Sequence, residues 1–199
     1  FDGQIGLTYR LFGSGELGVE LFFEPGEQEL PELPRFGVRT ALPGALDSLT
    51  WYGPGPQETH ADRLTLPVSL WSGRVSAQPV PYSRAQESGN KAAVRFAALR
   101  SSAGEGLLVV GEPQVSLNAS PFSTEAIEAA EHPHEIAPDG LTHLHVDSAQ
   151  RGVGGDNSWG AQPKREYRLY PVARRFSFRL RGLRGEDDPA AMARGLMSS

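Results

Sequence analysis

The feature that most constrains this chain is the close spacing of its glycines and prolines. The chain holds 23 glycines and 16 prolines in 199 residues, and they recur at short intervals over most of its length. Both residue types end or weaken helices and are common in tight turns, so this spacing leaves room for short strands but not for long helices. The sequence therefore predicts an all-β fold of many short strands.

The segments between these turns have the residue patterns of strands. Residues 176–180 are the clearest case, because two phenylalanines and a leucine alternate with polar residues and share one face. The predicted strands are 4–12, 16–23, 36–42, 46–51, 93–99, 106–111, 115–119, 141–148, 166–170 and 174–181. Gly13-Ser14-Gly15 separates the first two, which predicts a hairpin.

Only one segment has the pattern of a helix. Ser123 is a favourable N-cap, Glu125 lies in the first turn where the helix dipole favours an acid, and residues 126–131 are mostly helix formers. Pro133 ends the segment. Ten strands and one short helix predict an antiparallel β-sandwich over residues 1–185, followed by a mobile or short-helical tail over residues 186–199.

Composition and charge limit the classes of partner and the cell compartment that we expect for this chain. The chain has no cysteine, so it has neither disulfides nor thiolate metal sites, as expected for a cytoplasmic protein. Its net charge of −5, with both signs interspersed, argues against a nucleic-acid partner. No apolar run approaches the roughly 18 residues of a membrane span, and no signal peptide is visible. The chain lacks an initiator Met, so we expect a fragment or a processed chain.

The first segment that suggests a function is WYGPGPQETHADR, at residues 51–63. A predicted strand ends there in two aromatic residues and enters a Gly/Pro turn that displays polar side chains. The candidate residues are Trp51, Gly53, Gly55, Pro56, Glu58, Asp62 and Arg63. The loop could hold a ligand or dock another domain. Alternatively, its charged residues form a structural network of ion pairs and caps.

The second segment is glycine-rich and ends in a tryptophan. Gly154 and Gly155 allow the backbone to approach a ligand closely, and the next three residues, Asp156, Asn157 and Ser158, supply turn chemistry and hydrogen-bonding groups. Trp159 follows, and its indole suits a carbohydrate because a sugar has an apolar C–H face that lies flat on an aromatic ring. A tryptophan buried in the core is the competing interpretation. A phosphate cradle is disfavoured because no Lys-Ser/Thr follows.

Taken together, the motifs are similar to those of a known family. Residues 51–63 resemble the pattern W-[YFL]-G-x-G-P-x-E-N-Y-x-D-R, and residues 86–90 resemble P-x-E-N-G-N. Residues 122–132 are similar to Y-[ST]-x-E-x-L-x-x-A-x-H, and residues 152–159 match G-[VI]-G-G-D-[DN]-S-W. In this order the motifs resemble the C-terminal domain (small-chain or domain 5 type) of a glycoside hydrolase family 2 β-galactosidase of the bacterial lacZ type. The chain departs from the pattern at Pro54 and at Thr59-His60, where Asn-Tyr is usual.

The resemblance implies an antiparallel β-supersandwich similar to galactose mutarotase. It also implies a parent enzyme that hydrolyses terminal β-D-galactose residues of β-galactosides such as lactose. Retaining hydrolysis needs two carboxyl groups about 5–5.5 Å apart, and in this family both are glutamates on a separate (β/α)₈ barrel. No catalytic residue is therefore expected here. Trp159 is expected to form a platform for the sugar, chiefly on the aglycone side, with Asp156, Asn157 and Ser158 shaping its loop.

The implied partners are the barrel and the other domains of the parent enzyme, together with a β-galactoside. The parent is expected to be a homo-oligomer. No cofactor or metal is expected in this chain, because the family's Mg²⁺ and its Na⁺ or K⁺ are bound by other domains. A free-standing mutarotase or epimerase and a carbohydrate-binding module remain alternatives. His143 and His145 share a strand face and His132 and His134 flank a proline, but no third metal ligand is evident.

Overall fold

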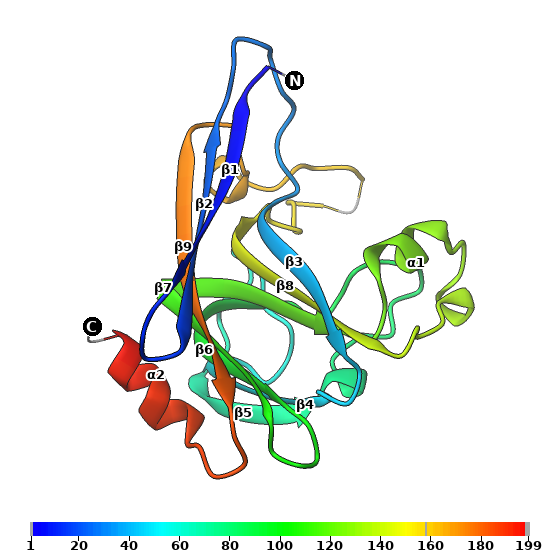
Figure 1. Ribbon diagram of the computed structural model, residues 1–199. Coiled ribbons are helices and arrows are strands. Elements are labelled where there is room, and N and C mark those ends of the chain that lie inside the picture. Colours follow the sequence, from blue (N-terminus) through cyan, green and yellow to red (C-terminus); the bar gives the residue numbers. More distant parts are fainter. Residues whose placement is uncertain (1, 158, 198–199) are drawn as a thin grey trace.

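A computed structural model describes residues 2–157 and 159–197 (Figure 1). Its strands are β1 (Gln4–Leu11), β2 (Glu16–Glu24), β3 (Arg35–Pro43), β4 (Ser48–Pro54), β5 (Val68–Arg74), β6 (Lys91–Arg100), β7 (Gly106–Ser120), β8 (Leu141–Gln150) and β9 (Arg174–Leu183). Its α-helices are α1 (Thr124–Ala129) and α2 (Pro189–Met197). Every pairing between these strands is antiparallel, so the predicted all-β antiparallel fold is confirmed.

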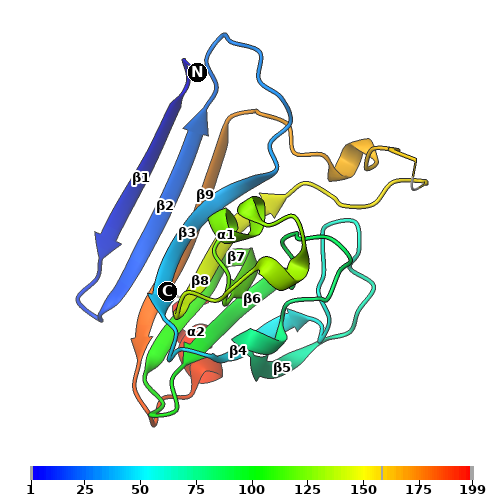
Figure 2. The same ribbon diagram turned by 90° about the vertical axis from the view of Figure 1, so that its right-hand side faces the viewer.

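The sheet branches at β7. The strand order is β1-β2-β9-β7-β6-β4-β5, with β3 and β8 off this path. One edge of β7 pairs with β6. The other edge pairs first with β9, from Gly106 to Gly111, and then with β8, from Ser116 to Ser120. The β1-β2-β9 and β3-β8 groups therefore diverge from β7 (Figures 1 and 2).

The main hydrophobic core lies between the diverging groups and β4 and β6. It takes Leu21 from β2, Phe176 from β9, Phe36 from β3 and Val146 from β8. Because side chains alternate across a strand, β6 also has a second face, and its Phe96 belongs to a separate apolar cluster. Both faces of the central strands are therefore buried.

The second cluster is covered by α2, so the described residues form two short α-helices where the sequence predicts one. The sequence analysis leaves residues 186–199 as a mobile or short-helical tail, and the short-helical alternative is confirmed for Pro189–Met197. Ala193 and Leu196 of this helix are 0% and 6% exposed against the sheet. The apolar outer face of β6 and β7, which receives this helix, is an arrangement that local sequence does not reveal. A boundary at residue 185 stays a prediction.

Other local predictions have mixed outcomes. The hairpin at Gly13-Ser14-Gly15 is confirmed, and so is the Ser123 cap, whose side chain accepts a hydrogen bond from Ala126 N at 3.1 Å. The predicted strand 166–170 is wrong, because Arg165–Tyr167 forms a 3₁₀ helix. Strand β5 was not predicted, and the two segments predicted at 106–111 and 115–119 join in β7. No helix within residues 2–157 and 159–197 combines the length and apolar character that a membrane crossing requires.

The packing of α2 yields a stability prediction. Leu196→Ala should lower the free energy of unfolding by about 2–4 kcal/mol, because it leaves a cavity between the helix and the sheet. The matched control is Met197→Ala, since Met197 is 44% exposed and should change stability by less than about 0.5 kcal/mol. Urea denaturation measures both values, and equal effects would contradict a packed α2.

Candidate functional site

The turn after β4 is fixed by two indoles. Trp51 is buried, and its Nε1 donates a hydrogen bond to the carbonyl of Pro54 at 3.1 Å. Trp71 Nε1 donates to the carbonyl of Gly53 at 3.0 Å. A Cβ atom added to Gly55 would lie 2.8 Å from the Trp71 ring and 3.0 Å from the Trp51 ring, so no side chain fits there. The next residue of the turn is Pro56.

Glu58 is the buried carboxylate behind this turn. It forms an ion pair with Arg63, accepts a hydrogen bond from the Tyr82 hydroxyl, and accepts another from Gly89 N at 2.8 Å. Burial alone would raise the pKa of Glu58, but the nearby His60, whose Nε2 lies 3.9 Å from Glu58 Oε1, and these hydrogen-bond partners outweigh it and hold the pKa well below its usual range. The structural ion-pair interpretation is therefore correct for Glu58 and Arg63.

Lys91 belongs to the same cluster, and the sequence analysis does not identify it. Its side chain is 1% exposed, its Nζ lies 5.1 Å from the centroid of the Trp51 ring, and this Nζ donates to the Gly89 carbonyl at 2.8 Å. Burial lowers the pKa of Lys91 to about 8, although the charge of Glu58 opposes this shift. Lys91 follows directly after the motif at residues 86–90, and this position could have identified it from the sequence.

Asp62 joins the two signature segments, which lie about 90 residues apart in the sequence. Its Oδ2 accepts a hydrogen bond from Gly154 N at 2.7 Å. Gly152 N donates to the Tyr167 carbonyl at 2.7 Å. A Cβ atom on Gly152 would lie 2.6 Å from Asp62 Oδ2 and 2.8 Å from Tyr167 Cβ, so this close approach requires glycine. The base of the glycine-rich loop is thus held on both sides.

Trp159 lies at the end of this loop and is 90% exposed. The competing interpretation of Trp159 as a core residue is therefore wrong. Its backbone N–H donates to Asn157 Oδ1 at 2.8 Å, and the neighbouring Asp156 and Gly155 are also exposed. Ser158 lies outside the described residues. An exposed indole on a loop with an anchored base can offer a flat apolar surface to a ligand.

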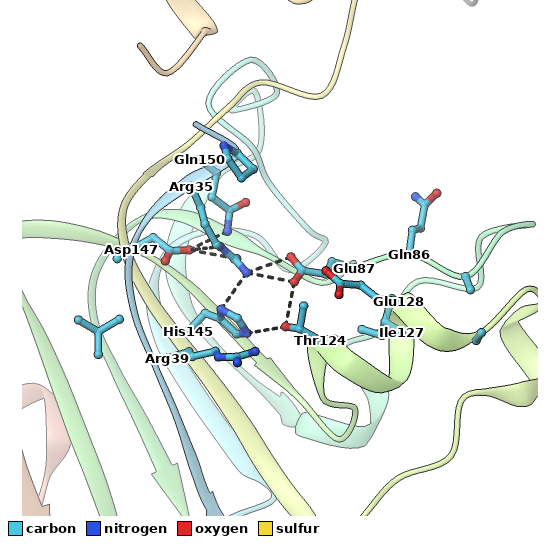
Figure 3. Close-up of a pocket in the computed structure, with 15 residues that line it drawn as sticks. Arg35, Arg39, Gln86, Glu87, Thr124, Ile127, Glu128, His145, Asp147 and Gln150 are labelled. Carbon is cyan, nitrogen blue, oxygen red and sulfur yellow. Dashed lines mark hydrogen bonds and ion pairs between the residues drawn. The ribbon is translucent and has the colours of Figure 1, made fainter. Parts of the chain in front are cut away.

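A separate cavity of about 670 Å³ lies between β3, β8, α1 and the segment before β6 (Figure 3). Arg35 stands at its centre. The Arg35 guanidinium contacts Asp147 Oδ2 at 3.1 Å, Glu87 Oε2 at 3.0 Å and His145 Nδ1 at 2.8 Å. Glu87 also accepts a hydrogen bond from the Thr124 hydroxyl at 3.3 Å.

Burial and neighbouring charges shift the pKa values of Asp147 and His145 in this cavity. Burial raises the pKa of Asp147, although Arg35 opposes the shift. Burial and then the charge of Arg35 lower the pKa of His145 to about 4, so this imidazole is neutral near pH 7 and its Nδ1 can accept from Arg35. Because Arg35 contacts Asp147, Glu87 and His145 at once, this network has a structural role.

The histidine pairs do not form a metal centre within the described chain. His143 Nε2 lies 3.0 Å from Asp139 Oδ2, whereas His145 contacts Arg35. The rings of His132 and His134 stack with their centroids 5.6 Å apart. In residues 2–157 and 159–197, no group of three or more His, Cys, Asp or Glu side chains is arranged to hold a metal ion.

Comparisons with known proteins agree with the motifs. A family model described as "Beta galactosidase small chain" matches residues 3–181. The chain is 41% identical over 165 residues to a β-galactosidase of Priestia megaterium, covering 82% of this chain and 16% of that protein. It is 38% identical over 168 residues to a β-galactosidase of Lactobacillus delbrueckii subsp. bulgaricus, covering 84% and 16%. The chain thus spans about 16% of the length of these relatives.

The contact between Asp62 and the loop predicts a local effect of mutation. Asp62→Ala removes the acceptor of the Gly154 N–H, so amide hydrogen exchange over residues 152–155 should quicken about tenfold. Asp62→Asn keeps an oxygen in place and should change exchange far less. Mass-spectrometric hydrogen exchange compares the two variants, and equal exchange in both would contradict the anchoring role.

The buried lysine predicts a pH dependence of stability. The folded-state pKa of Lys91 is about 8 and the ordinary value is 10.5, so between these pH values the unfolded state binds more protons. Stability relative to the Lys91→Met variant should therefore rise from pH 8 to about 10.5 and stay level below pH 8. Urea denaturation of both proteins at pH 7, 9 and 10.5 tests this, and a constant difference would contradict it.

Proposed function

The chain belongs to the β-galactosidase small-chain family, and on that premise we propose that it is the non-catalytic C-terminal domain of a family 2 β-galactosidase. The parent enzyme hydrolyses terminal β-D-galactose residues of β-galactosides such as lactose. Two observations support this role. The family match extends over residues 3–181, and the chain corresponds to about 16% of relatives that are β-galactosidases.

The observation that carries the proposal is the exposed indole of Trp159. Its 90% exposure on a loop anchored at Asp62 makes the ring available to a ligand. In the parent enzyme this ring forms a platform for the sugar, chiefly on the aglycone side, because the C–H face of a sugar packs against an aromatic face. Asp156 and Asn157 lie beside it and shape the loop. Their side chains can also form hydrogen bonds with sugar hydroxyls.

Three carboxylates in or near the signature segments already have partners within this chain. Glu58 is buried and paired with Arg63, Asp147 is buried and paired with Arg35, and Asp62 accepts from the loop. None of these three is left as a free pair about 5–5.5 Å apart across an open site, which retaining hydrolysis needs. The family resemblance places the cleaving glutamates on a barrel domain of the parent enzyme.

The finer features that the resemblance implies belong to the same proposal. The sandwich is of the galactose-mutarotase type, and the parent is a cytoplasmic homo-oligomer whose Mg²⁺ and alkali-metal ions are bound by other domains. The absence of cysteine is in keeping with the cytoplasm.

A kinetic experiment on the intact enzyme tests the role of Trp159. Trp159→Ala should raise KM for a β-galactoside about 5- to 150-fold and change kcat much less, because one aromatic platform contributes about 1–3 kcal/mol of contact. Trp159→Phe should have a smaller effect. Val172→Ala is a control, since it alters an exposed apolar residue outside the loop. An unchanged KM in Trp159→Ala would count against the platform.

Assays of this chain alone test whether it has any catalytic activity of its own. We expect no hydrolysis of a β-galactoside and no acceleration of the mutarotation of α-galactose, followed by polarimetry. Hydrolysis that disappears in Glu58→Gln would overturn the non-catalytic role. Faster mutarotation would favour the mutarotase alternative instead.

A further inference from the structure

Strand β1 exposes a row of apolar side chains at the edge of the sheet. Ile5, Leu7, Tyr9 and Leu11 alternate along one face and are 65%, 41%, 59% and 77% exposed. Together they are called the β1 stripe. β1 is the terminal strand of the sheet and pairs with β2, and Figure 2 shows it at the outer margin of the molecule.

The β1 stripe continues the face that the main core buries. Ile5 lies opposite Phe23, and Leu7 lies opposite Leu21. Side chains directly opposite each other in an antiparallel pair share a face of the sheet. Phe23 and Leu21 are only 4% and 6% exposed and belong to the core. The apolar layer therefore extends from β2 onto β1, where residues 2–157 and 159–197 leave it exposed.

The apolar face of β1 carries no charge, whereas Arg10 lies exposed on the opposite face of the same strand. Natural edges carry charges, prolines or bulges that prevent unwanted pairing. The β1 stripe contains neither a charge nor a proline, and all eight residues of β1 pair in regular register with β2. The terminal strand β5 differs, because its exposed Val68 and Leu70 share their face with Ser72 and Arg74. The β1 stripe is thus more uniformly apolar than the exposed face of the other terminal strand, β5.

The size of the β1 stripe favours an occupant within the same enzyme over a second copy. Four side chains of this size offer on the order of 400 Å². A stable complex of separate proteins needs about 800 Å² from each partner. A contact between parts of one enzyme can be smaller, because linkage supplies a high effective concentration. The relatives provide such parts, since the chain spans about 16% of their length.

We infer that the β1 stripe is the surface on which another domain of the same β-galactosidase docks an apolar face of its own. The inference rests on the proposed function, because it requires the parent enzyme. The occupant presents aliphatic or aromatic side chains, because a polar face here would leave its groups without hydrogen-bond partners against four apolar side chains.

Cysteine labelling of the intact enzyme tests this inference. The chain has no cysteine, so an introduced thiol is unique within it. The test variants are Ile5→Cys and Leu11→Cys in the β1 stripe. The matched controls are Thr8→Cys and Arg10→Cys, which lie exposed on the opposite face of the same strand. Reaction with a water-soluble maleimide is followed by peptide mass spectrometry, and we expect the two stripe thiols to react about tenfold or more slowly than the controls.

Each other outcome has a stated meaning. Equal rates for all four thiols would overturn the inference. Protection that disappears when the enzyme is diluted to monomers would assign the β1 stripe to a second copy and overturn the proposed occupant, whereas protection retained in the monomer supports it. Hydrolysis by the unmodified enzyme is assayed separately. A protected stripe in an enzyme without β-galactosidase activity would remove the proposed function, whereas an exposed stripe in an active enzyme would remove only the docking surface.

Discussion

The buried carboxylate of Glu58 ties the turn after β4 to the segment that leads into β6. Arg63, Tyr82 and Gly89 all bind it, so the chain on both sides is fixed by one charge. Asp62 precedes Arg63 directly, and its position therefore depends on this ion pair. Asp62 in turn anchors the glycine-rich loop. The position of the loop that carries Trp159 therefore depends on Glu58.

The buried charges of this chain hold its loops and strands in place. A buried ion pair is costly to break, since removing one partner leaves an uncompensated charge in the interior. Glu58 and Asp147 have this character, because each is buried and already engaged with an arginine. A domain of this kind suits an enzyme in which one part holds the shape of the site and another carries the reacting carboxyls.

Trp159 and the β1 stripe are exposed apolar features of different form. Trp159 is a single ring on a loop, which suits a small ligand. The β1 stripe is a regular row that extends a buried layer, which suits a protein surface. Under the two proposals, the sugar covers the Trp159 ring and another domain covers the β1 stripe.

The sequence by itself determined the features that depend on near neighbours. The β1–β2 hairpin, the Ser123 cap and the all-β antiparallel class follow from turn residues, capping and the two-residue period. The motifs also determined the family. The burial of Lys91, the packing of helix 189–197 and the contact of Gly152 with Asp62 became visible in the folded chain. Each of these depends on surfaces contributed by residues distant in the chain, and no local pattern records such an approach.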